Sequence, residues 1–266
     1  MRKYELDLTV SSIERLNDKY VHLKLGSEEK LPEMLPGQFV QVKVENSPAT
    51  FLRRPISINF YDEERNEMWL LVAAIGPGTK AIAALKAGDR LNCVLPLGNS
   101  FSIVSGSDNQ WEAGTSGKHL LVGGGVGVAP LLFQGKRVHD QGGEVVFLLG
   151  GRKDTDLLLL EEYEKYGRVM LTTEDGSKGE KGFVTNHSVL QKETFDIIQC
   201  CGPKPMMQAM AAYSHKTSTE CEVSLENKMA CGLGACLCCV EKTTKGNVCV
   251  CTEGPVMNTK RLLWLN

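Results

Sequence analysis

Four cysteines near the C-terminal end constrain this chain more than any other feature of its sequence. They are Cys231, Cys236, Cys239 and Cys251, and the gaps between them hold four, two and eleven residues. Two glycines lie between the first two cysteines, and glycine tolerates the positive φ angles of a tightly wound loop. A C-x4-C-x2-C run followed by a later cysteine is the plant-type ligand pattern of a 2Fe–2S cluster. The spacing therefore predicts a loop folded around such a cluster, in a protein that handles single electrons.

Disulfides and zinc are the two other uses for so many cysteines. Disulfide frameworks are typical of small secreted domains, whereas this chain has 266 residues and its first residues contain no apolar stretch of the signal-peptide kind. Zinc sites usually pair two short knuckles of cysteines, whereas here three cysteines crowd one loop and the fourth stands alone. The spacing favours iron–sulfur. A zinc-stabilised nucleotide-binding regulator without redox turnover remains an alternative from another class.

Composition and charge narrow the setting of the protein. The net charge of −2 gives no indication of nucleic acid or of an anionic membrane surface. The longest apolar run, residues 120–133, is interrupted by glycines and is too short to span a bilayer. Many cysteines without a signal peptide predict a cytoplasmic protein with reduced thiols. We therefore expect neither a nucleic-acid partner nor a membrane partner.

The first part of the chain, residues 1–101, has the pattern of a small β-barrel. Runs of strand-forming residues at 20–25, 38–44 and 68–72 are separated by turn signals rich in glycine, proline and aspartate. Several short strands at this spacing predict a barrel. One helix is expected within it, over residues 80–86.

The remaining chain changes character twice. Residues 102–118 are polar and rich in glycine and serine, which predicts a linker or surface loop. Short apolar strands then alternate with helical stretches such as 130–141 and 156–166 over residues 119–220, a pattern that predicts a parallel α/β sheet. Residues 221–266 form the cysteine-rich module. The expected fold class is therefore a β-barrel plus an α/β domain with a small C-terminal module.

Two sequence signals in the α/β part indicate nucleotide binding. The string Gly125-x-Gly127-x-x-Pro130 follows a strand and opens a helix, and such glycines permit close approach of a pyrophosphate. The pair Cys201-Gly202 follows another strand, at the kind of edge where ligands commonly bind. The competing interpretations are an ordinary strand–helix turn for the first signal and a plain helix start for the second.

A pair of arginines in the barrel part is the third signal. Arg53 and Arg54 precede an apolar strand that carries Ser57, so they could form a solvated edge or neutralise a phosphate. Gly78 and Thr79, at the start of the expected helix, could hold the same phosphate.

Taken in this order, the motifs resemble those of the ferredoxin-reductase superfamily, in which a flavin-binding barrel precedes a nicotinamide-nucleotide domain. Within it the chain most resembles the electron-transfer subunits of class B dihydroorotate dehydrogenases. The resemblance covers nearly the whole chain and is carried by the segments at 36–39, 53–58, 96–99, 123–127, 201–203, 229–236 and 251–256. It implies an FAD-binding β-barrel domain at 1–101, an NAD-binding α/β domain at 119–220 and a 2Fe–2S module at 221–266.

The resemblance also implies a role for each matching residue. The FAD would be held at its pyrophosphate by Arg54 and met near flavin N5 by Ser57. Further flavin-site residues would be Pro55, Ile56, Val72, Ala73, Ala74, Gly78 and Thr79. The nicotinamide nucleotide would be flanked by Gly125, Gly127, Cys201 and Gly202, and the cluster would be ligated by Cys231, Cys236, Cys239 and Cys251. No acid/base pair or nucleophile is evident, so we expect no catalytic side chain in this chain.

The implied activity is an electron relay in pyrimidine biosynthesis. An FMN-containing dihydroorotate dehydrogenase catalytic subunit would oxidise dihydroorotate, and this chain would pass the electrons through 2Fe–2S and FAD to NAD+. The expected assembly is a heterotetramer with two of each subunit. The alternative within the same class is a related flavin and iron–sulfur subunit, of an NADH-dependent ferredoxin:NADP reductase or of a sulfide dehydrogenase.

Two finer expectations concern ligands. Val248-Cys-Val-Cys251 predicts a strand on which Cys249 and Cys251 share a face, and the Gly254-Pro255 that follows, as in the family, favours Cys251 as the ligand. Arg152 and Lys153 follow the second strand of the sheet, and acidic residues follow them at once. Because those carboxylates would oppose a 2′-phosphate, we expect NADH rather than NADPH.

Overall fold

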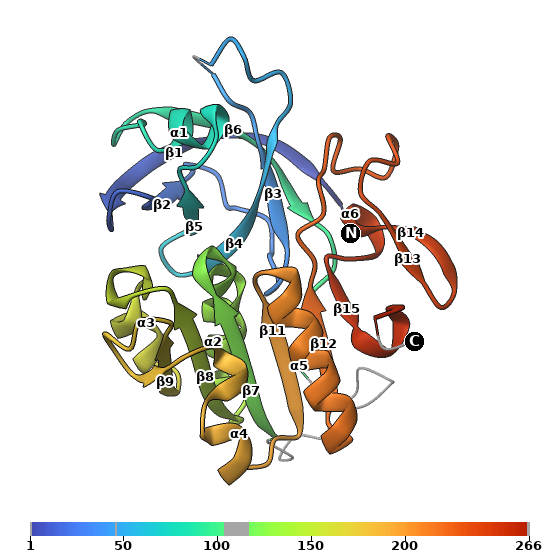
Figure 1. Ribbon diagram of the computed structural model, residues 1–266. Helices are drawn as coiled ribbons and strands as arrows, with labels where there is room; N and C mark the ends of the chain where they lie inside the picture. The colour runs from blue at the N-terminus through green and yellow to red at the C-terminus, as the bar shows by residue number, and fades with distance from the viewer. Residues whose placement is uncertain (1, 46, 104–116, 265–266) are drawn as a thin grey trace. The chain divides into compact units, whose positions relative to one another are not determined.

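The computed structural model describes residues 2–45, 47–103 and 117–264 (Figure 1). The chain divides into two compact units. The first comprises residues 1–100, 227–241 and 247–255, and the second comprises residues 101–226, 242–246 and 256–266. Residues 221–266 therefore contribute to both units. Most of the expected linker at 102–118 lies outside the described residues.

Within the described residues, the first unit contains a closed six-stranded barrel, which confirms the predicted barrel (Figure 1). The strands follow one another around it in the order β1-β2-β5-β4-β3-β6. Leu8 and Val10 of the first strand are buried while their neighbours are exposed, the alternation of a sheet with one face on the core. The strands are β1 (Tyr4–Arg15), β2 (Tyr20–Gly26), β3 (Phe39–Val42), β4 (Arg54–Asp62), β5 (Glu67–Ala73) and β6 (Arg90–Leu97).

The helix inserted in the barrel unit, α1 (Pro77–Ile82), begins and ends earlier than the predicted 80–86. Its start is set by Thr79, whose hydroxyl accepts hydrogen bonds from the Ile75 and Gly76 amides and donates to the Gly76 carbonyl. A threonine that satisfies the free amides of a first turn specifies where a helix starts.

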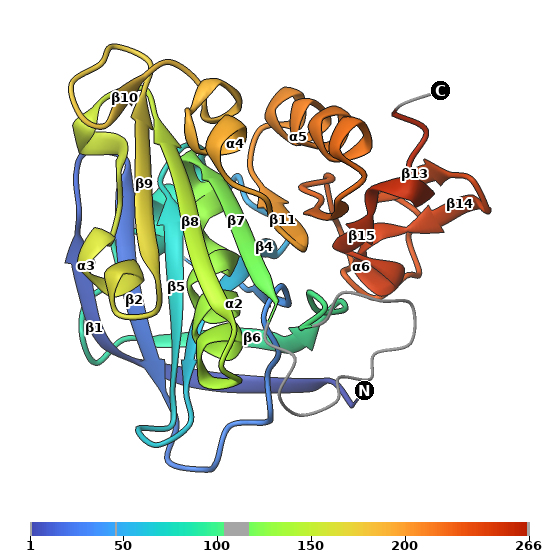
Figure 2. The ribbon, with the colours of Figure 1, turned by 90° about the horizontal axis from the view of Figure 1, so that it is seen from below.

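The second unit contains a seven-stranded sheet in the order β10-β9-β8-β7-β11-β12-β15. Figure 2 shows β9, β8, β7 and β11 side by side. All pairs are parallel except β12 with β15. The strands are β7 (Lys118–Gly124), β8 (Glu144–Gly151), β9 (Arg168–Thr173), β10 (Glu180–Lys181), β11 (Ile197–Cys201), β12 (Glu220–Ser224) and β15 (Val256–Asn258). Their runs of consecutive buried residues are typical of strands covered on both faces.

Helices connect the strands of this sheet, as the alternating pattern predicted. They are α2 (Ala129–Asp140), α3 (Leu160–Glu164), α4 (Val189–Lys192) and α5 (Lys204–Thr217), with 3₁₀ turns at Gly125–Val128, Asp154–Asp156, Val184–Asn186 and Thr259–Arg261. The predicted helix at 156–166 is in fact a 3₁₀ turn followed by the short α3. In the described part of the chain, no helix combines the length and apolar character needed to cross a membrane.

The cysteine-bearing segment contains a hairpin of β13 (Val240–Thr243) and β14 (Gly246–Cys249), followed by α6 (Val250–Glu253). The prediction that residues 248–251 form one strand is therefore wrong. The strand ends at Cys249 and Cys251 lies in the helix, so the two thiols do not share a strand face.

Candidate functional site

The four predicted ligand cysteines all belong to the barrel unit, and backbone amides point at three of their sulfur atoms. The Leu233 amide lies 3.3 Å from Cys231 Sγ, and the Gly234 amide lies 3.1 Å from Cys251 Sγ. The Cys251 amide lies 3.4 Å from Cys239 Sγ. Such N–H···S contacts stabilise thiolates and are one of the means by which proteins tune iron–sulfur clusters. The loop thus fits the cluster that the spacing predicts.

Protonation distinguishes two of these thiols. Hydrogen bonds to its sulfur lower the pKa of Cys231 to about 6, and the bond from the Leu233 amide has the largest effect. Burial raises the pKa of the Cys251 thiol to about 12. Because iron binds the thiolate, Cys231 is ready to bind at neutral pH, whereas Cys251 must lose its proton as metal arrives.

All ten cysteines are free thiols in the structure. Cys239 and Cys251 are buried, Cys231 is half-buried and Cys236 is exposed. Within the described residues, no three histidine, cysteine, aspartate or glutamate side chains converge tightly enough to hold a single metal ion. A binuclear cluster makes a different demand, since its four thiolates are shared between two iron atoms.

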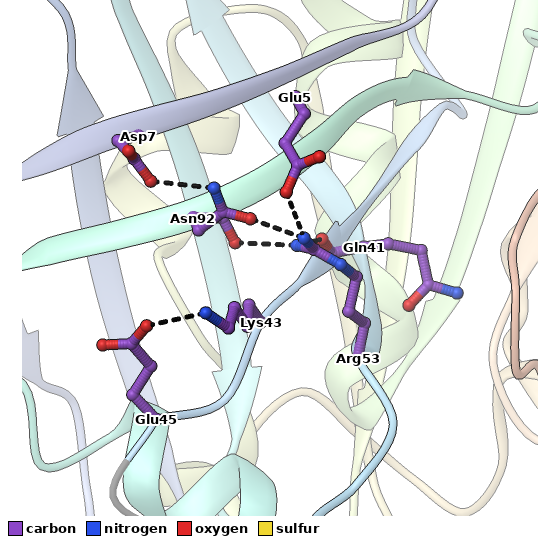
Figure 3. Close-up of polar contacts among 7 residues, drawn as sticks. All are labelled: Glu5, Asp7, Gln41, Lys43, Glu45, Arg53 and Asn92. Carbon is purple, nitrogen blue, oxygen red and sulfur yellow. Dashed lines mark hydrogen bonds and ion pairs between the residues drawn. The ribbon is translucent and has the colours of Figure 1, made fainter.

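The two adjacent arginines of the barrel have different surroundings. Arg53 donates to Glu5 at 2.7 Å, to the Asn92 side chain at 2.6 Å and to the Gln41 carbonyl at 3.2 Å (Figure 3). It therefore ties β1, β3 and β6 together. Among the described residues, Arg54 donates only to the nearby carbonyls of Leu52 and Arg53, at 3.0 and 3.3 Å. Of the two, Arg54 has the guanidinium that can turn to a phosphate.

The helix start and Arg54 are close neighbours. A Cβ atom at Gly78 would lie 2.9 Å from Arg54 Nε and 3.0 Å from the Thr50 methyl group, so a larger residue there would displace the Arg54 side chain. The hydroxyl of Thr79 is engaged in the first turn of α1. The structure thus brings together Arg54 and Gly78, two of the predicted flavin-site residues.

The other predicted flavin-site residues differ in how much of their side chains they present. Pro55, Ile56, Ser57, Ala73 and Ala74 are half-buried. Val72 is 0% exposed, so neither its side chain nor its backbone is open to a ligand, in contrast to its expected place in the flavin site.

The two predicted nucleotide signals meet at the same edge of the sheet. Cys201 and Gly123 are register partners at the carboxyl ends of β11 and β7. A Cβ atom at Gly127 would lie 2.5 Å from the Gly202 Cα atom, so these two backbones touch. The order of the strands reverses between β7 and β11, and ligands of open α/β sheets commonly bind at such a switch point.

A second acidic loop, hydrogen-bonded to the one that carries Arg152, was not identified from the sequence. The Glu174 and Asp175 amides donate to the Gly151 and Arg152 carbonyls, at 3.1 and 3.2 Å. Hydrogen bonds from Ser177 lower the pKa of the Asp175 carboxyl. The backbone of Asp175 thus lies against that of Arg152, and no local sequence pattern predicts this pairing of two loops.

Two family models match parts of the chain. One describes the iron–sulfur cluster binding domain of dihydroorotate dehydrogenase B and matches residues 226–263. The other describes an oxidoreductase NAD-binding domain and matches residues 121–212. The first confirms the preference for iron–sulfur over zinc.

A solved structure of an NADH-dependent reduced ferredoxin-NADP oxidoreductase is similar to the whole chain. The TM-score is 0.83 at 26% identity, and the match covers 97% of this chain and 90% of that one. This similarity, together with the closed barrel and the NAD-binding match, confirms the ferredoxin-reductase-like fold.

Curated relatives are more similar in sequence. The electron transfer subunit of dihydroorotate dehydrogenase B (NAD(+)) from Lysinibacillus sphaericus (strain C3-41) is 41% identical, over 86% of this chain and 87% of the relative. The subunit of the same description from Caldanaerobacter subterraneus subsp. tengcongensis is 37% identical, over 98% of this chain and 100% of the relative. With such identity over nearly its whole length, the chain belongs to the family of dihydroorotate dehydrogenase B electron transfer subunits.

Proposed function

We propose that this chain is the electron-transferring, NAD-linked subunit of a cytoplasmic dihydroorotate dehydrogenase that serves pyrimidine biosynthesis. An FMN-containing partner subunit oxidises dihydroorotate to orotate, and this chain delivers the electrons to NAD+ in an assembly with two copies of each subunit. The observation that carries the proposal is the cysteine loop, where three backbone amides point at ligand sulfurs in the unit that also holds Arg54.

The side chains of this protein bind and orient, while the bound groups supply the redox chemistry. A 2Fe–2S cluster exchanges single electrons, and FAD accepts or releases one or two, which allows exchange with a nicotinamide. Cys231, Cys236, Cys239 and Cys251 hold the cluster. Arg54 neutralises the FAD pyrophosphate beside Gly78, and the half-buried Ser57 offers a hydroxyl to the flavin ring.

The nucleotide is held by backbone rather than by charge. Gly125, with φ of +57°, turns the chain at the end of β7, and Gly127 lets that turn lie against Gly202. The nicotinamide nucleotide binds where these two turns meet.

A second candidate is the corresponding subunit of an NADH-dependent reduced ferredoxin-NADP oxidoreductase. The observation that favours it is the 26% identity and 0.83 TM-score to that structure. The relatives at 37–41% identity favour the dihydroorotate dehydrogenase subunit.

Reconstitution tests the proposal. The chain, prepared without oxygen and with ample iron, is expected to carry FAD and iron and to reduce dyes with NADH, but not to oxidise dihydroorotate. Adding the FMN-containing subunit from the same genome is expected to give a complex of two copies of each, with dihydroorotate:NAD+ activity. Dihydroorotate oxidation by the chain alone, or failure of the two subunits to associate, would contradict the division of labour.

The preference for NADH is a separate prediction. The carboxylates of Asp154 and Asp175 lie on the two loops beside Arg152, so a 2′-phosphate would meet repulsion there. We expect kcat/KM with NADH to exceed that with NADPH by about tenfold or more, which is about 1.4 kcal/mol. Asp154→Asn combined with Asp175→Asn should narrow the ratio, whereas Glu164→Gln at the end of α3 should leave it unchanged. Equal kcat/KM for the two nucleotides in the unmodified protein would refute the preference.

A further inference from the structure

One buried side chain of the barrel has no hydrogen-bond partner for either of its polar atoms in the part of the chain that the structure describes. Gln41 in β3 is 0% exposed, and both its Oε1 and Nε2 atoms are buried without a hydrogen bond. Gln38, three residues earlier and also buried, accepts from the Leu35 amide at 2.7 Å and donates to the Gly98 carbonyl at 3.0 Å. A buried amide without partners costs free energy, so a protein that retains one normally supplies the missing partner.

The amide of Gln41 lies against the cysteine loop. A Cβ atom at Gly232, the residue after Cys231, would lie 2.7 Å from Gln41 Cγ and 2.9 Å from Gln41 Nε2. Gly232 has φ of +69°, so glycine is required there both by the backbone and by the close approach of Gln41.

The position of Gln41 is held from its other side. Its carbonyl accepts from Arg53, and Figure 3 shows its side chain extending away from the contacts of that arginine. In the antiparallel pairing of β3 with β4, Gln41 lies opposite Pro55, which is in the same strand as Arg54 and Ser57. The backbone of β3 therefore holds the side-chain amide of Gln41 beside the cysteine loop, and β3 itself pairs with β4, the strand of the proposed flavin site.

We propose that the Gln41 side-chain amide donates an N–H hydrogen bond to a sulfur atom of the 2Fe–2S cluster on the side of Cys231. The inference rests on the proposed cluster site and adds a residue outside the cysteine motif to it. Because reduction adds negative charge to the cluster, a donor aimed at its sulfur stabilises the reduced form and raises the reduction potential.

The test is an EPR-monitored redox titration of the cluster-loaded chain carrying Gln41→Met, which keeps the length of the side chain and removes the donor. We expect reduction to become about tenfold less favourable, a fall of about 59 mV for a one-electron couple. Gln38→Met is the matched control. It removes a buried glutamine that already has partners, so it should lower the free energy of unfolding and leave the potential unchanged.

A measurement on the unsubstituted protein removes any dependence on how the variant folds. With isotope-labelled glutamine side-chain nitrogen, pulsed EPR of the reduced cluster should detect a nitrogen coupling that Gln41→Met abolishes. An EPR-active cluster without this coupling overturns the inference and leaves the proposed function intact, as does a Gln41→Met cluster of unchanged potential. A chain that binds no cluster when supplied with iron and sulfide would instead refute the proposed function, and this inference with it.

Discussion

Replacing Cys251 with serine is expected to abolish the EPR signal of the cluster or to shift it greatly. Cys251 is 1% exposed, its sulfur accepts from the Gly234 amide, and its own amide donates to Cys239 Sγ. It is thus held by the backbone to two other parts of the loop, and a hydroxyl binds iron more weakly than a thiolate does. Iron content and EPR of the purified variant measure the loss.

The matched control is Cys249→Ser, two residues away. Cys249 is half-buried and ends β14; its thiol interacts with that of Cys239, but among the described residues no backbone amide points at it. We expect this variant, and Cys238→Ser at an exposed position, to keep the signal of the unmodified protein. A cluster that survives in Cys251→Ser and disappears in Cys249→Ser would assign the fourth ligand to Cys249.

The second large effect concerns assembly. Leu233 and Leu237, which lie among the ligand cysteines, are 47% and 65% exposed. In the proposed complex the cluster must lie close to the flavin of the partner, and apolar residues at the centre of an interface carry much of its binding energy. Leu237→Glu would bury a charge there, so we expect the Kd for the FMN-containing subunit to rise by about tenfold or more. Ultracentrifugation or calorimetry of the mixed subunits measures it.

Two comparisons make the interface experiment specific. NADH–dye activity of the isolated Leu237→Glu chain should stay near that of the unmodified protein, because the flavin and nucleotide residues are untouched. Leu263→Glu places the same charge at a position of similar exposure, 44%, in the other unit, and should leave assembly unchanged. If both variants assemble as tightly as the unmodified chain, the cysteine loop is not the docking surface.

The elements and motifs that could be predicted from the sequence are those with local causes. Alternating and continuous apolar runs predicted the barrel and the sheet, and the cysteine spacing predicted the iron–sulfur loop that the family model confirms. The limits of α1 were not predicted correctly, because the hydroxyl of Thr79 makes the helix begin before residue 80. The prediction of a strand over residues 248–251 was wrong because a strand pattern of four residues is too short to show where a helix begins.

Roles that depend on distant residues could not be predicted. Arg53 and Arg54 look alike in the sequence, and only contacts with Glu5 and Asn92, 48 and 39 residues away, assign the first to the barrel scaffold. The neighbourhood of Gln41 and Gly232 likewise joins positions that no spacing rule connects.

The division of the chain into units has a consequence for its biosynthesis. After residue 226 the chain enters the barrel unit at 227–241, returns to the sheet unit at 242–246, and repeats the exchange at 247–255 and 256–266. The ligand thiols therefore leave the ribosome only after all the barrel strands have been synthesised. All four ligand thiols are therefore present only once the barrel strands have been made, and a chain that stops short of Cys251 lacks parts of both units.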